Sequence, residues 1–184
     1  TEIENQVLSM PDRWILSRLR DTADQVRNSL DNYQFNDGAN ILYKFVWHEF
    51  CDWYLEAVKP ALYGKFDEAA ALASKATLWR VLHDTLILLH PFIPFVTEEI
   101  WHKLSGTSGS IMTAKMPGFD SEYPEIFADK EAEADMNFVM GLVTAVRNIR
   151  GEMNIQPSIS LSVIVQSDST KLIETVENNR FIIS

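Results

Sequence analysis

Few residues in this sequence have the type and spacing that metal chemistry requires. Glu99 and His102 form one E-x-x-H pair, the spacing that di-iron bundle proteins use twice, together with two further glutamates. The sequence holds no second such pair, and its one cysteine and four histidines match no zinc-ligand spacing. We therefore expect no metal site. A di-metal enzyme stays an alternative. Metal analysis of the protein would then show roughly stoichiometric iron or manganese.

Motifs for nucleophilic catalysis and for phosphate binding are also missing from the sequence. Residues 106–110 (GTSGS) lack the G-x-S-x-G register, and neither a G-x-x-x-x-G-K loop nor a G-x-G-x-x-G loop occurs. Cys51 stands among aromatic residues with no base beside it, which favours a buried structural role. We therefore assign no catalytic residue.

One stretch of ten residues is rich in aromatic rings. It holds Phe45, Trp47, Phe50, Trp53 and Tyr54. On an α-helix these rings fall on two stripes, one with Val46, Phe50 and Trp53 and one with Trp47, Cys51 and Tyr54. Most of them fit the core of a helical bundle. A minority facing outward would form a platform on which bases of a single-stranded RNA loop stack.

Two arginines lie near the end of the last long predicted helix. Arg147 and Arg150 are three residues apart and share one helix face. Cations at a helix C-terminus stabilise it by about 0.3–1 kcal/mol, and the same charges would meet an RNA backbone. Both interpretations stay open.

The composition is that of an ordinary globular protein. The 184 residues, 46% hydrophobic and 23% charged, suffice for one domain or for one domain with a small appendage. The single cysteine excludes an internal disulfide and favours a reduced, cytoplasmic setting. We expect no signal peptide and no bilayer-spanning segment, because the most apolar stretch, residues 85–96, is too short.

The net charge of −10 is unusual for a protein that binds nucleic acid. Residues 120–135 contain seven acidic residues and one lysine, so this window alone accounts for −6 of the net charge. We interpret the window as a solvated acidic face or helix start. A local basic surface is therefore compatible with the rest of the chain.

Periodic apolar residues predict a mainly α fold, an antiparallel helical bundle formed by residues 1–151. Ser9 and Pro11 mark the start of the first helix, and Pro60 is expected to end the second. The predicted helices cover approximately residues 11–33, 39–58, 67–89, 94–104 and 130–150.

The last part of the chain has a different pattern. Residues 160–166 (SLSVIVQ) alternate polar and apolar side chains and predict a strand, and a helix is predicted at about residues 170–181. One strand is not a sheet, so we interpret residues 152–184 as a small, truncated α/β appendage that further polypeptide would complete.

Four stretches of the sequence occur in an order found in one known family. They are residues 12–19 (DRWILSRL), 49–56 (EFCDWYLE), 90–101 (HPFIPFVTEEIW) and 146–155 (VRNIRGEMNI). The first and third resemble the anticodon-binding domains of class I aminoacyl-tRNA synthetases for aliphatic amino acids. The second and fourth resemble the valyl-tRNA synthetases of that class. The similarity covers essentially the whole chain, which is identified as a C-terminal anticodon-binding fragment of that family.

The resemblance implies that the full-length enzyme joins valine to tRNA(Val) through a valyl-adenylate, using ATP and magnesium. The nucleotide-binding signatures of the family, H-I-G-H-like and K-M-S-K-S, are absent from this sequence, and so is the editing domain. This piece would bind the anticodon arm without a cofactor and without catalysis of its own. The preceding helix of the family, which helps to form the anticodon pocket, and the coiled coil that usually follows are missing too.

By the same resemblance, tRNA contacts fall on the second predicted helix and at the end of the fifth. The candidate residues are Asp52, Trp53, Leu55, Glu56, Lys59, Arg147 and Arg150. The two apolar residues would be stacking platforms, the three charged residues of the second helix would meet base edges or phosphate, and the two arginines would contact the RNA backbone.

Expected partners are the anticodon arm of tRNA(Val) and the catalytic and editing domains of the same polypeptide, with the protein monomeric. The alternative is a protein–protein or interdomain docking bundle. In that case the aromatic face covers another domain, and the chain does not bind RNA autonomously.

Overall fold

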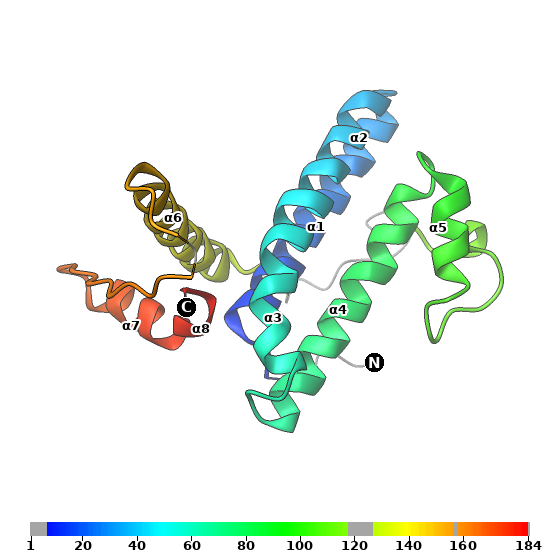
Figure 1. Cartoon of the computed structure of the whole chain (residues 1–184). Helices are drawn as coiled ribbons and strands as arrows, with labels where there is room; N and C mark the ends of the chain where they lie inside the picture. Colours follow the sequence, from blue (N-terminus) through cyan, green and yellow to red (C-terminus); the bar gives the residue numbers. More distant parts are fainter. Residues whose placement is uncertain (1–6, 118–126, 157, 184) are drawn as a thin grey trace. The chain divides into compact units, whose positions relative to one another are not determined.

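The computed structural model of the chain describes residues 7–117, 127–156 and 158–183 (Figure 1). The chain divides into two compact units, an N-terminal unit (Thr1–Lys130) and a C-terminal unit (Glu131–Ser184). The helix predicted at residues 130–150 groups with the C-terminal unit. The domain boundary expected after residue 151 stays a prediction.

The N-terminal unit is a bundle of helices, as the sequence predicts. Its elements are α1 (Met10–Asp31), α2 (Phe35–Lys44), η2 (Phe45–Tyr54), α3 (Leu55–Leu62), α4 (Glu68–Leu89), α5 (Pro94–Trp101) and the short η3 (Ile111–Thr113). α2, η2 and α3 follow one another without a break and form one rod, residues 35–62 (Figure 1). α1 packs against α2, η2 and α4, and α4 also packs against α3 and α5.

The first turn of α1 positions a buried carboxylate. Asp12 N donates a hydrogen bond to Ser9 Oγ at 3.4 Å, and Ser9 N donates one to Asp12 Oδ2 at 3.2 Å. This reciprocal capping box satisfies backbone donors at the helix start, and Pro11 occupies a first-turn position that needs no N–H. The helix start predicted from Ser9 and Pro11 is confirmed, and Asp12 is fully buried.

The Asp12 carboxylate joins three elements of the bundle. Tyr54 Oη, at the end of η2, donates a hydrogen bond to Asp12 Oδ1 at 2.8 Å, and Ser74 Oγ of α4 donates to Oδ2 at 3.2 Å. Burial raises the pKa of Asp12 above its ordinary value, although the hydrogen bonds from Ser9, Tyr54 and Ser74 oppose that rise. Burial and the Asp12 charge together raise the pKa of Tyr54 well above its ordinary value.

The π-helix η2 decides which aromatic residues enter the core. Its hydrogen bonds run between residues five apart, so residues on one face recur at longer steps than in an α-helix. Buried residues of the rod step by five from Phe45 to Phe50 and then by four to Tyr54. The predicted α-helical stripes are therefore wrong here: Tyr54 is fully buried, whereas Trp47, placed on the same stripe, is 55% exposed.

The rod also extends one turn further than predicted. Pro60 lies inside α3, which ends at Leu62 rather than before the proline. The helix stops where Gly64 adopts a φ of +78°, in the left-handed region that favours glycine after a helix end.

The turn between α4 and α5 is held by side chains of residues 90–101. His90 Nδ1 lies 2.8 Å from Thr97 Oγ1, which donates a hydrogen bond to the Ile93 carbonyl at 3.0 Å. The Phe92 ring approaches Gly38 of α2 so closely that a Cβ there would lie 3.1 Å from Phe92 Cζ. The sequence stretch therefore fixes the turn and closes it on α2.

The C-terminal unit contains α6 (Lys130–Glu152), α7 (Thr170–Asn178) and α8 (Arg180–Ile183). The helix predicted at about residues 170–181 is present but is interrupted at Asn179. Residues 160–166, predicted as a strand, are irregular chain with no ladder partner among the described residues. The physical reason is that a strand is held by hydrogen bonds to a neighbouring strand, and the described part of the unit supplies none.

The burial of Asp12 predicts a pH dependence of stability. Its pKa in the folded protein lies above the ordinary 3.8, so the folded state binds this proton more readily than the unfolded state. Protonation therefore adds stability as the pH falls through the raised pKa, and the gain is complete below the ordinary pKa. Asp12→Asn removes this titration while the other carboxylates remain.

Urea titrations give the free energy of unfolding of the wild type and of Asp12→Asn at each pH. The difference, wild type minus variant, should become more positive as the pH is lowered from about 7 to about 4. A decrease over that range would contradict the prediction, because it would mean that the hydrogen bonds outweigh burial.

Candidate nucleic-acid interface

The five predicted tRNA-binding residues of the rod all reach the surface, to different degrees. Asp52, Glu56 and Lys59 are exposed, and Trp53 and Leu55 are half-buried. Lys59 Nζ donates a hydrogen bond to Glu56 Oε1 at 2.5 Å, so these two predicted residues are in direct contact. Their roles toward RNA stay predictions.

Two exposed rings that were not predicted as site residues lie next to this group. Tyr43 and Trp47 are 59% and 55% exposed, and their rings are parallel within 5°, with 6.5 Å between centroids. Tyr43 also meets the His48 ring edge to face at 5.9 Å, and His48 Nδ1 lies 3.3 Å from Asp52 Oδ2. We call these four residues, Tyr43, Trp47, His48 and Asp52, the outer cluster.

One sequence signal could have identified the ring pair. Tyr43 and Trp47 are four residues apart, the spacing of neighbours on one helix face. Tyr43 precedes the ring-rich stretch, however. Periodicity alone does not show which face of a largely apolar helix is exposed to solvent. The contact of Tyr43 with His48, five residues on, follows the wider turn of the π-helix.

The outer cluster is carried by a rod that is fixed to α1 through a bidentate ion pair. Arg18 Nε and Nη2 lie 2.9 and 3.1 Å from the two carboxylate oxygens of Glu49. Glu49 follows His48 directly in η2, so this ion pair orients the turn that carries His48 and Asp52. A site on a braced helix keeps its geometry better than one on a loop.

The outer cluster offers exposed rings for stacking and a carboxylate that accepts hydrogen bonds. A base stacked on an exposed ring gains about 1–3 kcal/mol, and the carboxylates of Asp52 and Glu56 accept hydrogen bonds from amino groups. Burial, and secondarily the Asp52 charge, raise the pKa of the neighbouring Cys51 thiol. The thiol therefore stays protonated at neutral pH and is a poor nucleophile.

The Arg150 side chain, in the C-terminal unit, is hydrogen-bonded to the protein backbone. Its Nη2 donates hydrogen bonds to the carbonyl oxygens of Gln156 at 2.6 Å and Ile159 at 2.9 Å. The guanidinium thus ties the chain that leaves α6 back onto the helix. Its predicted contact with an RNA backbone stays a prediction, and a phosphate would have to compete with these two carbonyls.

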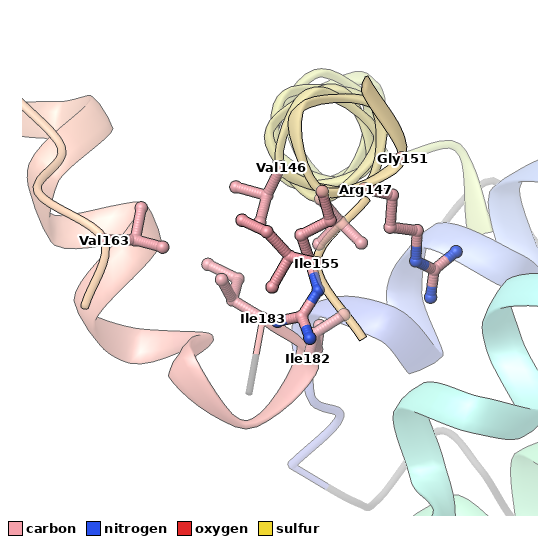
Figure 2. A pocket seen from close by; sticks show the side chains of 9 residues that line it. Val146, Arg147, Gly151, Ile155, Val163, Ile182 and Ile183 are labelled. Atoms are coloured by element: carbon pink, nitrogen blue, oxygen red, sulfur yellow. The ribbon is translucent and has the colours of Figure 1, made fainter. Parts of the chain in front are cut away.

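Arg147 and Arg150 both line a pocket of about 560 Å³ in the C-terminal unit (Figure 2). The other lining residues are Val143, Val146, Gly151, Ile155, Val163, Ile182 and Ile183. Figure 2 shows Ile155, Ile182 and Ile183 gathered against one side of α6, with the Arg147 side chain reaching away from them. The structure therefore groups the two predicted arginines around an apolar pocket.

Both side chains of the E-x-x-H pair lie within ion-pair distance of other residues of α5 and the turn after it. Glu99 pairs with Lys103 at 2.8 Å, and His102 pairs with Glu98 at 3.0 Å. Within residues 7–117, 127–156 and 158–183, no group of three His, Cys, Asp or Glu side chains could hold a metal ion.

The described residues also contain no helix that combines the length and the apolar character needed to cross a membrane.

Comparison with known proteins gives the family of the chain. Residues 12–165 match the family model described as the anticodon-binding domain of tRNA ligase, and the chain belongs to that family. The family expected from the four sequence stretches is thereby confirmed.

The curated relatives that it matches are valine–tRNA ligases. The chain is 44% identical over 175 residues to that of Geobacter sulfurreducens, 42% over 177 residues to that of Syntrophotalea carbinolica and 40% over 172 residues to that of Bacillus subtilis. These alignments cover 94% to 95% of this chain and 19% of each relative. The chain therefore spans about a fifth of the length of these relatives.

The two hydrogen bonds of Arg150 predict a structural effect of its removal. Arg150→Ala should lower the free energy of unfolding by about 1 kcal/mol, because two backbone acceptors lose a charged donor at a solvent-exposed position. The amides of Ile155 and Ile159, which donate hydrogen bonds to the carbonyls of Arg150 and Gln156, should then exchange faster with solvent. Asn148→Ala, at an exposed position of the same helix, is the matched control, and an equal effect of both variants would contradict the structural role of Arg150.

Proposed function

We propose that this chain is the anticodon-arm binding module of a valine–tRNA ligase. Membership of the anticodon-binding family supports the proposal, and so do the valine–tRNA ligases among its relatives. The observation that carries it is the outer cluster, where the parallel exposed rings of Tyr43 and Trp47 stand beside Asp52 on a braced helix. Such a surface offers stacking and hydrogen bonding to unpaired bases.

In the proposed complex, a loop base stacks on Trp47, and the half-buried Trp53 and Leu55 extend the apolar platform. Carboxylates of the rod accept hydrogen bonds from base amino groups, and Lys59 contacts a phosphate. Stacking and edge contacts dominate, because a chain with a net charge of −10 gains little from general attraction to phosphate. Arg147 and Arg150 of the C-terminal unit contact the sugar–phosphate backbone of the RNA.

The whole protein is proposed to attach valine to tRNA(Val) with ATP and magnesium, as a cytoplasmic monomer. Catalysis would come from the catalytic and editing domains of the same polypeptide. This chain alone would therefore bind RNA without catalysing the reaction.

The second candidate is a docking bundle without autonomous RNA binding. One observation favours it: α5 presents Phe95 at 91% exposure, with Ile93 and Val96 exposed beside it. Contiguous exposed apolar residues mark protein contact surfaces. Here the chain would hold another domain rather than RNA.

Two exposed aromatic residues separate these candidates. Trp47→Ala should weaken binding of tRNA(Val) by about 5- to 100-fold, because a stacking surface is removed. Phe95→Ala, on α5, should leave tRNA affinity unchanged, and neither variant should shift the melting temperature strongly, since both side chains are largely exposed. If Phe95→Ala weakens tRNA binding while Trp47→Ala does not, the outer cluster is not the RNA site.

Selectivity for the anticodon is tested by titrating the chain, and the ligase-length protein, with tRNA(Val) and with the same tRNA carrying another anticodon. The ligase-length protein should bind the altered tRNA at least about 10-fold more weakly, since edge contacts of roughly 1–3 kcal/mol are lost. Equal affinity of that protein for both tRNAs would refute anticodon recognition.

A further inference from the structure

Tyr33, in the turn between α1 and α2, occupies a backbone position that usually belongs to glycine. It follows Asn32, the C-cap of α1, and has a φ of +60°, in the left-handed region. Tyr33 N donates a hydrogen bond to the Leu30 carbonyl at 3.0 Å, and Gln34 N donates one to the Ser29 carbonyl at 2.7 Å. This is the Schellman arrangement, whose left-handed residue is usually glycine and sometimes asparagine. A tyrosine is strained there, because its Cβ crowds the following carbonyl oxygen.

Burial of the Tyr33 ring does not offset this strain. The side chain is 81% exposed. Its ring meets the Phe35 ring edge to face, with 6.4 Å between centroids, and Phe35 is itself 54% exposed. A strained residue that gains little from the fold points to a function of its side chain. Since both rings are exposed to solvent, that function is contact with another molecule.

The turn also forms a small hollow with polar walls. The hollow has a volume of about 310 Å³, at the lower end of the usual range for small-ligand sites. Its lining residues are Tyr33, Gln34, Phe35, Asn36 and Asp37. The two amides offer hydrogen-bond donors and acceptors, and an ionised carboxylate accepts hydrogen bonds from amino groups. Gln34 is the N-cap of α2 but makes no side-chain capping hydrogen bond, so the helix start does not use its amide.

An exposed stripe of the rod connects this hollow with the outer cluster. Asn36, Asn40, Tyr43 and Trp47 follow one another at steps of four, three and four residues, the spacing of one helix face. All four are exposed. Asn36 and Tyr43 lie about 10 Å apart along the axis of α2. Proteins that bind single-stranded RNA stack successive bases on rings along such a surface, so the hollow continues the surface proposed for RNA.

A basic protein segment is the other partner that two rings beside Asp37 would accept, through a cation–π contact and an ion pair. A cationic side chain only donates hydrogen bonds, so it would leave the amide donors of Gln34 and Asn36 unused. The edge of a base carries both donors and acceptors. This match and the continuity with the outer cluster favour RNA.

We propose that residues 33–37 are a second nucleotide subsite, which takes one unpaired base of the bound tRNA. The base stacks on Tyr33, and its edge forms hydrogen bonds with the amides of Gln34 and Asn36 and with the Asp37 carboxylate. Bases with an exocyclic amino group fit better than uracil, because the carboxylate needs a donor. The inference rests on the proposed function in tRNA binding.

Three substitutions of Tyr33 test the subsite in the ligase-length protein with tRNA(Val). Tyr33→Gly and Tyr33→Asn remove the ring and suit the left-handed backbone, so each should weaken binding by about 5- to 100-fold. Tyr33→Phe keeps the stacking ring and should bind like the wild type. Unchanged affinity of the Gly and Asn variants would overturn the proposal. A loss confined to Tyr33→Gly would also overturn it, because flexibility of the turn would then be the cause.

Melting of the 184-residue chain separates a role of the ring in binding from a role in folding. Tyr33→Gly should raise the melting temperature by about 2–4 °C, because the left-handed strain is relieved. Tyr63→Gly is the matched control. Tyr63 is 79% exposed but has an ordinary φ of −94°, so glycine there adds only flexibility and should lower the melting temperature. An equal fall in both variants would overturn the proposal, because the Tyr33 ring would then serve the fold.

The chemistry of the bound group is tested by ultraviolet crosslinking of the ligase-length protein to tRNA(Val). Tyr33 or Phe35 should crosslink to a nucleotide of an unpaired segment, and crosslinks to paired nucleotides alone would overturn the proposal. A short oligo-arginine peptide provides the comparison. If Tyr33→Gly loses affinity for this peptide and keeps its affinity for tRNA, the turn binds a basic protein segment instead.

The outcomes for the subsite and for the proposed function are distinguishable. If Trp47→Ala weakens tRNA binding and Tyr33→Gly does not, only the subsite is refuted. If Tyr33→Gly weakens binding and Trp47→Ala does not, the subsite stands without the outer cluster. If the wild-type ligase-length protein binds tRNA(Val) and none of these variants weakens binding, both RNA surfaces are refuted.

Discussion

The bundle of the N-terminal unit depends on one buried carboxylate. Asp12 is fully buried, and it accepts hydrogen bonds from Ser9, Tyr54 and Ser74, with no cation among its partners in the described part of the chain. Each bond comes from a different part of the chain, so satisfying this one group fixes the start of α1, the end of η2 and the middle of α4 together. A buried carboxylate with fewer donors would be costly, which makes this arrangement of the three elements strongly preferred.

The same carboxylate determines the surface as well as the core. Because Tyr54 turns inward to Asp12, the wide turns of η2 leave Trp47 outside and hold Trp53 at the boundary. The bidentate pair of Arg18 with Glu49 then fixes the outward side of the rod against α1. The buried Tyr54–Asp12 hydrogen bond and the Arg18–Glu49 ion pair at the surface therefore together fix the orientation of the outer cluster.

Local signals in the sequence predict helices and their starts well, since Ser9 and Pro11 act within one turn of their own position. They predict the site less well. Whether Trp47 or Tyr54 is buried depends on a partner 42 residues away from Tyr54 in sequence, and no α-helical period contains the five-residue step of a π-helix. The sequence predicts that Arg150 is a cation near a helix end. It does not predict that Arg150 binds the carbonyls of Gln156 and Ile159, because the direction that the chain takes after α6 is known only from the structure. Residues 160–166 alternate polar and apolar side chains as a strand does, yet the segment is irregular chain, because a strand needs a neighbouring strand that alternation alone does not supply.

The hydrogen bond between Lys59 and Glu56 has a further consequence for how the rod meets a polyanion. The two side chains form an ion pair of no net charge, so in the proposed complex a phosphate that binds Lys59 would replace the Glu56 carboxylate and bring no net gain in charge neutralisation. The displaced carboxylate would then be available to accept hydrogen bonds from amino groups of nearby bases. The amino groups of a duplex are already paired, so only an open loop would supply both the phosphate and the new donor.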